Sequence, residues 1–315
     1  NDNTPAGDVS KGQFRFENVL AGTYYVCEEP QTGWYQTEPS SGIQHNGLYC
    51  HTVNLGYAED KTEIQFGNYQ GSDVNICKKD NYNRSLSGWD IVLASEKVQS
   101  AKSINVSNGS GTSSSSLPAG TYLIKVSGTY RYGNTQMIAD AGYSYRPLGI
   151  PYGTGGWVSG LDLPSKGLMA WVNGSSVNWG AYDSGHVYTY VYKHNGGAVN
   201  ISIYDDNYGD NVNSNFTFEI FKVNTWAKGT TERNGCVTLK AVPYGQYILD
   251  EYLKDGWVDI SGKGLEVTIN DISENFTIEN RIDAPVTIKA TKIVCDYEED
   301  LPNWGAIKSD GNPIT

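Results

Sequence analysis

The sequence predicts an all-β protein built from several β-sandwich modules in series. Short runs of alternating apolar and polar residues are separated by Gly, Ser, Thr and Asn, and the 315 residues include 23 Tyr but only 2 Met, which is typical of extracellular β-proteins. One segment occurs twice, as FENVLAGTYYVCEEPQTGW (16–34) and LKAVPYGQYILDEYLKDGW (239–257). Each copy predicts a turn, an alternating strand and a Gly-Trp turn, so the chain is an array of similar modules.

Charge and cysteine content limit the classes of partner and the compartment. A formal net charge of −12 leaves no basic stripe for phosphate contacts, so cations are better candidate partners than nucleic acids. No apolar run reaches the length that a membrane helix needs, and we interpret the chain as exported, cell-surface or extracellular material. Five cysteines without a CxxC pair favour structural disulfides over zinc and leave one thiol over.

The first module is expected to span residues 1–70. Its alternating segments predict strands at 13–16, 23–28, 49–55 and 63–68, separated by Gly, Pro and Ser turns. An opening strand is missing from this module. Cys27 and Cys50 lie on two of the predicted strands, and a disulfide between them would join these strands across a long loop.

The second module is interrupted by an insert. It opens at Asp73 with DVNICKKDNYNRSLSGWDIVL, and its natural continuation, GCVTLKAVPYGQYILDEYLKDGW, begins only at Gly235. We therefore assign residues 72–95 and 226–282 to the second module and 96–225 to an inserted β-sandwich of ordinary domain size. Residues 284–315 alternate like a first strand and are assigned to the start of a further module or to a donor strand.

The recurring residues G-x-F-x-F-x-N-V-x-A-G-T-Y-x-V-x-E, with a following G-W and a terminal F-G-N, resemble the Cna B-type and SdrD B-like repeats of bacterial surface proteins. The resemblance covers residues 11–68, then 74–93 together with 235–280. It implies tandem prealbumin-like or Ig-like sandwiches that serve as stalks or pilus modules. Copies of the chain itself are then the expected partners.

Some members of this family carry an internal Lys-Asn isopeptide bond, catalysed by a carboxyl group. The resemblance places Lys78, Glu251 and Asn280 in these three roles. The chemistry needs a buried, neutral lysine amine and a protonated carboxyl that polarises the asparagine amide. A strand lysine beside a structural glutamate, without a crosslink, is the alternative. Cys77, next to Lys78, is expected to pair with Cys236.

The two ends of the insert, TYRYGNTQ (129–136) and ISIYDDNYGDNVNSNFTFEI (201–220), resemble PA-IL-type calcium-dependent galactose-binding lectins. The resemblance implies a lectin-like sandwich with one calcium ion, whose hard-oxygen ligands come from Tyr132, Asp206, Asn207, Asp210 and Asn211. Because this loop is shorter than the lectin loop, Asp205 remains an alternative to Asp206. A purely polar hairpin is the alternative to a metal site. The aromatic residues Trp157, Trp171 and Trp179, with His186, are candidates for sugar stacking, although core positions are commoner for them.

The two ends of the chain are complementary. The first module is expected to lack an opening strand, and residues 287–296 (TIKATKIVCD) resemble such a strand without a module, so strand addition between subunits would build a head-to-tail filament. By the pattern of the second module, Lys292 would then face Glu28 and Asn68 of a neighbour, and Cys295 could complete a covalent link. The alternative is that the chain is one stretch of a longer multi-domain polypeptide.

Sequons for N-glycosylation are frequent but weak signals in a chain rich in Asn, Ser and Thr. They begin at Asn83, Asn105, Asn108, Asn173, Asn200, Asn215 and Asn275.

Two functions follow as expectations. The first is an extracellular structural or adhesive protein, acting as a surface stalk or a pilus-like filament subunit. The second is a calcium-dependent carbohydrate-binding adhesin, in which the repeats display the lectin-like insert. An enzyme is not expected, because neither G-x-S-x-G nor HExxH occurs and the four histidines are scattered.

Overall fold

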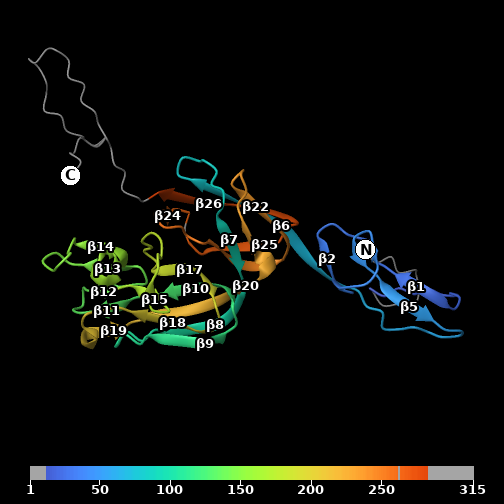
Figure 1. The fold of residues 1–315 in the computed structure, drawn as a ribbon, viewed down its shortest axis with the longest axis horizontal. Coiled ribbons are helices and arrows are strands. Elements are labelled where there is room, and N and C mark those ends of the chain that lie inside the picture. Colours follow the sequence, from blue (N-terminus) through green and yellow to red (C-terminus); the bar gives the residue numbers. More distant parts are fainter. Residues whose placement is uncertain (1–11, 262, 283–315) are drawn as a thin grey trace, which may run out of the picture. The chain divides into compact units, whose positions relative to one another are not determined.

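The computed structural model describes residues 12–261 and 263–282 (Figure 1). As predicted, the chain is all-β: the described residues form strands and four single 3-10 turns, and they contain no α-helix. The turns are η1 (Gly160–Asp162), η2 (Pro164–Lys166), η3 (Tyr208–Asp210) and η4 (Thr225–Ala227). No helix among the described residues is long and apolar enough to cross a membrane.

The N-terminal module contains few paired strands. Its elements are β1 (Gly22–Val26), β2 (Trp34–Glu38), β3 (Gln44–His45), β4 (Leu48–Tyr49), β5 (His51–Leu55) and the first part of β6 (Gly67–Asp80). β1 pairs only with β5, and β2 pairs with β6. The strand predicted at 13–16 is wrong: residues 13–16 are not in a strand, none of the described strands pairs with them, and Phe14 and Phe16 are exposed. The predicted strand at 63–68 begins only at Gly67.

The second module is a two-sheet sandwich. Its strands after β6 are β7 (Asp90–Ala94), β21 (Lys228–Thr230), β22 (Cys236–Pro243), β23 (Gly245–Glu251), β24 (Trp257–Asp259), β25 (Leu265–Ile269) and β26 (Ser273–Ile282). One sheet has the order β2-β6-β26-β24, with β22 also on β6, and the other has the order β21-β7-β23-β25. Buried apolar side chains such as Ile76, Trp89 and Leu249 fill the space between them. A single strand, β6, therefore belongs to both modules.

The insert forms three sheets around its own core. Its strands are β8 (Glu96–Ser103), β9 (Thr112–Leu117), β10 (Gly120–Ser127), β11 (Tyr130–Tyr132), β12 (Ile138–Ala139), β13 (Tyr143–Arg146), β14 (Gly156–Ser159), β15 (Ala170–Val172), β16 (Ser175–Ser176), β17 (Val187–His194), β18 (Gly197–Ile203), β19 (Asn211–Asn213) and β20 (Thr217–Val223). The sheet orders are β17-β10-β20-β8, β14-β13-β12-β11-β19 and β16-β15-β18-β9. Its largest buried side chains include Trp179, Tyr130 and Phe216.

A tyrosine hydrogen bond recurs at the start of one strand in each of the three parts. Tyr24 Oη donates to the Leu20 carbonyl at 2.7 Å, and Tyr247 Oη donates to the Pro243 carbonyl at 2.8 Å. In the insert, Tyr122 Oη donates to the Pro118 carbonyl at 3.0 Å. The Gly-x-Tyr after each turn is its sequence signal, so the repeat has a third, weaker copy in the insert that the sequence comparison of the two long copies missed.

Candidate functional site

A lysine, a glutamate and an asparagine meet in the core of the second module. Lys78 lies on β6, Glu251 ends β23, and Asn280 lies on β26. Lys78 Nζ is 2.8 Å from Glu251 Oε2, and Asn280 Nδ2 donates a hydrogen bond of 2.6 Å to Glu251 Oε1. All three side chains are fully buried. The structure thus brings together the residues that the sequence resemblance assigns to one triad.

Strand alternation explains why a lysine points into the core. Val74, Ile76 and Lys78 are spaced two residues apart and are all fully buried, so they share the inward face of β6. β26 pairs in parallel with β6, with Ile278 opposite Lys78, so Asn280 lies on the adjacent strand. Glu251 comes from the other sheet of the sandwich. The triad therefore ties the two sheets together at one point.

Burial disfavours the charged forms of the acid and the amine. Desolvation lowers the pKa of Lys78, although the nearby Glu251 carboxylate acts in the opposite direction. Desolvation also raises the pKa of Glu251 to about 7. Transfer of one proton from Lys78 to Glu251 leaves the total charge of the pair unchanged, so a neutral pair needs no proton from solvent. The lowered pKa of Lys78 and the raised pKa of Glu251 are in the directions that the roles implied by the resemblance require.

A neutral pair beside an asparagine can form an amide bond. In the reaction that the resemblance implies, the lone pair of Lys78 Nζ would attack Asn280 Cγ while the Glu251 carboxyl polarises the amide. Glu251 would give its proton to the leaving nitrogen and take up the proton that the attacking nitrogen loses. The Nζ–Cγ bond would form, the Cγ–Nδ2 bond would break, and one ammonia would leave. The Lys78 contact lacks hydrogen-bond alignment, and Asn280 Oδ1 has no hydrogen-bond partner. Neither atom is held in a competing hydrogen bond.

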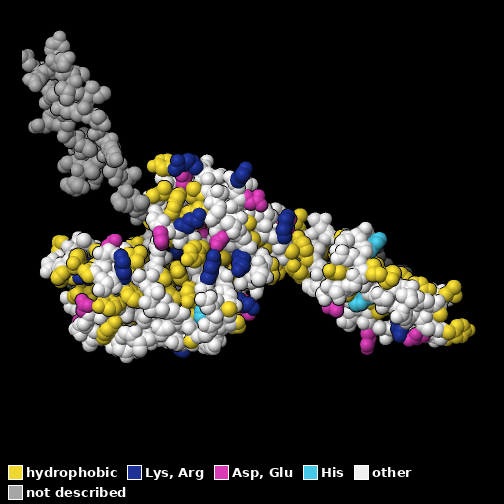
Figure 2. Space-filling model, in the orientation of Figure 1, with side chains coloured by type: hydrophobic (Ala, Val, Ile, Leu, Met, Phe, Trp, Pro, Cys, Tyr) yellow, Lys and Arg dark blue, Asp and Glu magenta, His cyan; other side chains and the backbone are white. Residues whose placement is uncertain are grey.

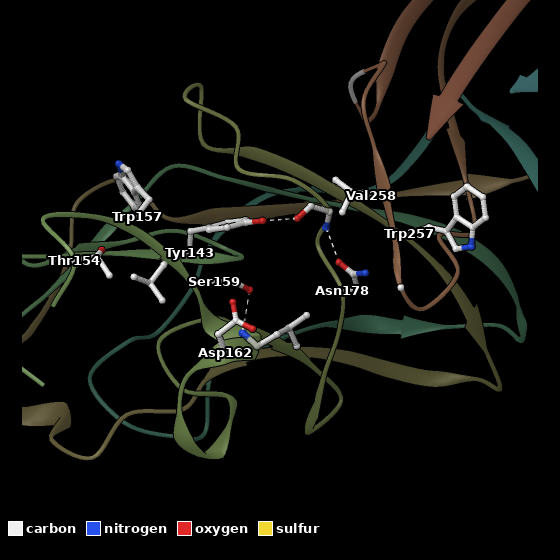
Figure 3. A pocket seen from close by; sticks show the side chains of 12 residues that line it. Tyr143, Thr154, Trp157, Ser159, Asp162, Asn178, Trp257 and Val258 are labelled. Carbon is white, nitrogen blue, oxygen red and sulfur yellow. Dashed lines mark hydrogen bonds between the residues drawn. The ribbon is translucent and has the colours of Figure 1, made fainter. Parts of the chain in front are cut away.

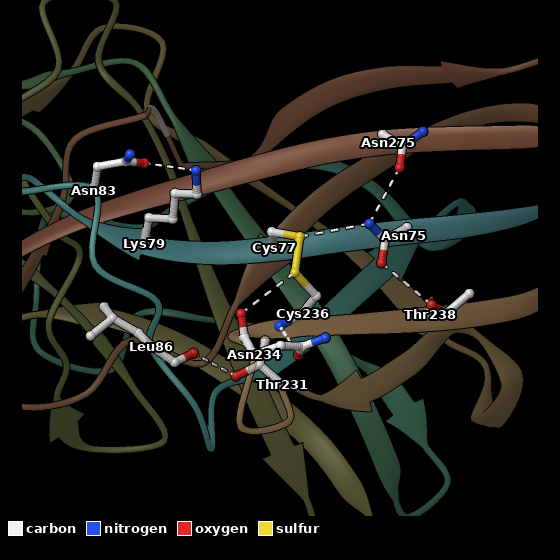
Figure 4. Close-up of a disulfide and its surroundings, with 10 residues drawn as sticks. All are labelled: Asn75, Cys77, Lys79, Asn83, Leu86, Thr231, Asn234, Cys236, Thr238 and Asn275. Atoms are coloured by element: carbon white, nitrogen blue, oxygen red, sulfur yellow. Dashed lines mark hydrogen bonds between the residues drawn. A yellow bond between two sulfur atoms is a disulfide. The ribbon is translucent and has the colours of Figure 1, made fainter.

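Two disulfides are present among the described cysteines. Cys27 is bonded to Cys50, and Cys77 is bonded to Cys236. Cys77 and Cys236 lie directly opposite each other on β6 and β22 (Figure 4). Because β26 pairs with the other edge of β6, the disulfide fastens one side of this strand and the triad lies on its other side.

A glutamate and an asparagine of the N-terminal module repeat part of this arrangement. Asn68 Nδ2 donates a hydrogen bond of 2.8 Å to Glu28 Oε2, as Asn280 does to Glu251. Asn68 pairs with Gln36 on β2 just as Asn280 pairs with Asp259 on β24. No lysine of the described chain contacts this pair, and Glu28 Oε1 is buried without a hydrogen-bond partner. The residues predicted to complete the site, Lys292 and Cys295, lie outside the described residues.

The predicted calcium loop connects β18 to β19. Tyr132 and Asn211 lie opposite each other on β11 and β19, so the two ends of the predicted ligand set are adjacent. Asp206 and Asp210 are exposed, and Asn207 uses its side-chain oxygen to accept the Gly209 N–H. Among the residues that the structure describes, no three His, Cys, Asp or Glu side chains form a metal cluster. A cation here would therefore be held by no more than two such side chains, together with amide and carbonyl oxygens.

Asp205, rather than its neighbour Asp206, carries a buried oxygen in this loop. Asp205 Oδ2 and Asn211 Oδ1 are both buried, and neither has a hydrogen-bond partner. Burial raises the pKa of Asp205, while the Asn211 amide acts in the opposite direction. Unpaired buried oxygens are costly, and a bound cation would satisfy both. The chemistry of these donors fits calcium, with Asp205 as the carboxylate ligand.

The aromatic candidates separate into core and surface residues. Trp179 is buried and donates to the Ala170 carbonyl at 2.8 Å, and Trp171 stacks on Tyr204. Trp157 lies partly exposed, 4.9 Å from the His186 ring. It lines a cavity of about 580 Å³ together with residues that include Tyr143, Asp162, Asn178 and Trp257 (Figure 3). Of these candidates, Trp157 is the one that lines this cavity, and His186 contacts its ring.

A buried network behind His186 was missed by the sequence comparison. Asp140 Oδ2 accepts hydrogen bonds from His186 Nδ1 at 2.8 Å and from Tyr188 Oη at 2.9 Å. Burial raises the pKa of Asp140. The network fixes the orientation of the half-buried imidazole. No signal could have revealed it, because Asp140 and His186 lie on segments far apart in the sequence and match no motif.

The sequons differ in accessibility. Most of their asparagines are exposed: Asn83, Asn108, Asn173, Asn215 and Asn275. Asn105 and Asn200 are half-buried, and Asn200 Nδ2 donates to the Ser110 carbonyl and to Ser113 Oγ. A glycan on Asn200 would break these bonds, so the exposed sequons are the better acceptors.

Comparison with known proteins gives no close relative. No family model matches the sequence, and no curated protein matches it. Among solved structures, the chain is similar to the major pilin subunit BcpA of Bacillus cereus, at 9% identity and a TM-score of 0.13, over 68% of this chain and 100% of that one. It is also similar to a streptococcal ancillary pilin, at 15% identity and a TM-score of 0.16, over 84% of this chain and 76% of that one. TM-scores this low do not establish a shared overall fold.

Proposed function

We propose that this chain is an extracellular structural subunit of a head-to-tail filament. Its second module would be locked by a Lys78–Asn280 amide, and its N-terminal module would take up a strand from another copy. The observation that carries the proposal is the pair of matching Glu–Asn sites, one with its lysine and one that no lysine of the described residues contacts. The two disulfides support an oxidising, extracellular environment.

Exposed apolar residues in the N-terminal module support strand uptake. The repeat aligns Phe16 with Leu239 and Val19 with Val242. Leu239 and Val242 are only 4% and 0% exposed, whereas Phe16 and Val19 are 69% and 40% exposed. β6 covers this position in the second module, and Figure 2 shows hydrophobic side chains on the surface of the N-terminal module. A strand equivalent to β6 would cover them, with a gain of about 25 cal/mol for each Å² buried.

The donor would be the segment 286–294 of a second copy. Its residues Ile288, Ala290 and Lys292 alternate as Val74, Ile76 and Lys78 do in β6, so two small or apolar side chains and one lysine would face the recipient core. Addition of a strand to an open edge supplies backbone hydrogen bonds along its whole length. A donor at one end and a recipient at the other give a heterologous contact, which builds fibres when it does not close a ring.

Charged substitutions in the donor segment test this assembly. We expect Ile288→Asp combined with Ala290→Asp to abolish filaments in negatively stained images of the purified full-length chain, because two carboxylates would enter an apolar site. Thr287→Asp lies on the opposite face of the alternating segment and is the matched control, with filaments retained. Filaments that persist in the double variant, or a wild-type chain that stays monomeric, would contradict the proposed assembly.

Calcium-dependent recognition by the insert is a second candidate function. The two buried unpartnered oxygens of Asp205 and Asn211 favour it, and the cavity beside Trp157 offers an aromatic surface and polar groups for a glycan. When bound, calcium would neutralise the acidic loop and link β18 to β19. The repeats would then display this insert on the filament.

Thermal unfolding with calcium and with a chelator tests the metal site. Calcium is expected to raise the melting temperature of the chain, and magnesium to raise it less, because magnesium demands near-ideal octahedral geometry and loses its water ligands reluctantly. Asp205→Asn should abolish the calcium shift, and Asp206→Asn should preserve it. If Asp206→Asn abolishes the calcium shift and Asp205→Asn preserves it, Asp206 is the ligand. Equal melting temperatures in calcium and in chelator would contradict the metal site. Binding to a glycan array that is lost in chelator would support the adhesin function.

A further inference from the structure

We propose that the junction between subunits is covalent: Glu28 promotes an amide bond between Lys292 of one subunit and Asn68 of the next. This inference rests on the strand uptake proposed above, and it adds a bond-forming reaction to it. Three observations carry it: the Asn68–Glu28 hydrogen bond of 2.8 Å, the buried unpartnered Glu28 Oε1, and the matching triad of the second module.

The register of the second module places the missing lysine. β26 runs parallel to β6, with Ile278 opposite Lys78 and Asn280 opposite Asp80. A donor strand in the same relation to the first part of β6 would have Lys292 opposite Phe66 and Val294 opposite Asn68. Lys292 would then approach the Glu28 carboxyl from the side on which Lys78 approaches Glu251. The free Oε1 of Glu28 corresponds to the Glu251 oxygen that contacts Lys78 Nζ.

Docking of the donor strand would bury Glu28 and Asn68 and so make the site reactive. Asn68 is exposed, whereas its counterpart Asn280 is fully buried. In the second module, desolvation is the main cause of both pKa shifts, and the N-terminal site acquires the same burial only when a strand lies over it. A free subunit would therefore keep its Glu28 and Asn68 unreacted until a neighbour arrives.

The reaction balances without any oxidant or other reagent. Lys292 Nζ attacks Asn68 Cγ, the Nζ–Cγ bond forms and the Cγ–Nδ2 bond breaks. Glu28 gives its proton to the leaving nitrogen, which departs as ammonia, and takes up the proton that the attacking Nζ loses. A disulfide is the poorer candidate for the link, because Cys27 and Cys50 are bonded to each other, as are Cys77 and Cys236. Cys295 therefore finds no free thiol among the described cysteines. Cys295 also follows Lys292 by three residues, so in a donor strand of alternating side chains the two would face opposite sides.

Mixing two full-length variants tests the bond in trans. Asn68→Ala keeps the donor lysine but has no acceptor, and Lys292→Arg keeps the acceptor but has no nucleophile. On boiled, reduced denaturing gels, wild type should give a ladder, each variant alone a monomer, and the mixture a dimer. The dimer should yield one branched peptide joining Lys292 to Asn68, lighter than its two parts by one ammonia. Adding Glu28→Gln to the Lys292→Arg chain should remove the dimer.

The possible outcomes distinguish failure of the covalent link from failure of strand uptake. Lys289→Arg and Glu29→Gln are the matched controls, since they change a neighbouring lysine and a neighbouring glutamate, and ladders should persist in both. Filaments of wild type that dissolve to monomers in reducing detergent would overturn the covalent link and leave strand uptake standing. A branched peptide formed within one chain, with no dimer in the mixture, would overturn linkage between subunits. Absence of both filaments and ladders would overturn both proposals.

Discussion

Peptide mapping of the purified chain is expected to find a branched peptide in which Lys78 is joined to Asn280, lighter than its two parts by one ammonia. Lys78→Met should abolish this species and lower the free energy of unfolding of the second module by about 4–5 kcal/mol, the loop-closure value for a long crosslinked segment. Met fills a similar volume and leaves Glu251 buried as a neutral acid. The unfolding free energy is measured by denaturant titration.

Two further variants make this prediction specific. Lys79→Met changes the adjacent lysine, whose Nζ donates to Asn83 Oδ1 at 2.7 Å, and should keep the branched peptide. Glu251→Gln should prevent the bond and leave the Lys78 charge buried without its partner, which costs about 3–5 kcal/mol. A wild-type chain that yields separate Lys78 and Asn280 peptides would show that the triad is a buried ion pair and no more.

Loss of the Cys77–Cys236 disulfide is the second large effect. Replacement of both cysteines by serine should lower the unfolding free energy by about 2–5 kcal/mol. The size of this loss should depend on whether the Lys78–Asn280 amide is present, because each crosslink shortens the loop that the other closes. The disulfide alone spans a sequence separation of 159, but with Lys78 bonded to Asn280 the remaining path from Cys236 to Asn280 is only about 44 residues (280 minus 236).

A double-mutant cycle measures this dependence. The cysteine replacements should cost about 1 kcal/mol more in the Lys78→Met background than in the crosslinked chain, since closure of the longer loop removes more entropy. Tris-phosphine reduction of the wild type should reproduce the smaller cost. Equal costs in both backgrounds would mean that no amide joins Lys78 to Asn280, or that strain in the folded state outweighs the chain entropy.

The all-β fold, the strand-borne lysine and both disulfides could be predicted because they depend on local patterns. Alternation alone places Val74, Ile76 and Lys78 on one face, and the two copies of the repeat then align Glu28 with Glu251. The strand predicted at residues 13–16 failed for a physical reason. Alternating residues form a strand only beside a partner, and no strand of the described chain lies next to Phe14 and Phe16.

Details set by three-dimensional packing were beyond the sequence. Asp205 and Asp206 are adjacent acids in a polar turn, and only the folded loop distinguishes the one with a buried oxygen. The Asp140 network depends on β12 and β17 ends meeting, which no spacing in the sequence encodes. The third tyrosine turn, at Tyr122, was hidden because the rest of the insert differs from the repeats.

The continuity of β6 through both modules has a mechanical consequence. A tensile force applied at Asn68 would be transmitted along β6 to Lys78, through the proposed amide to Asn280, and on to the chain after β26. The 201 residues between Lys78 and Asn280 (79 to 279), about 700 Å when fully extended, would carry no tension. The insert could unfold, bind or be exchanged without lengthening the fibre, so stiffness and recognition would be independent properties of one chain.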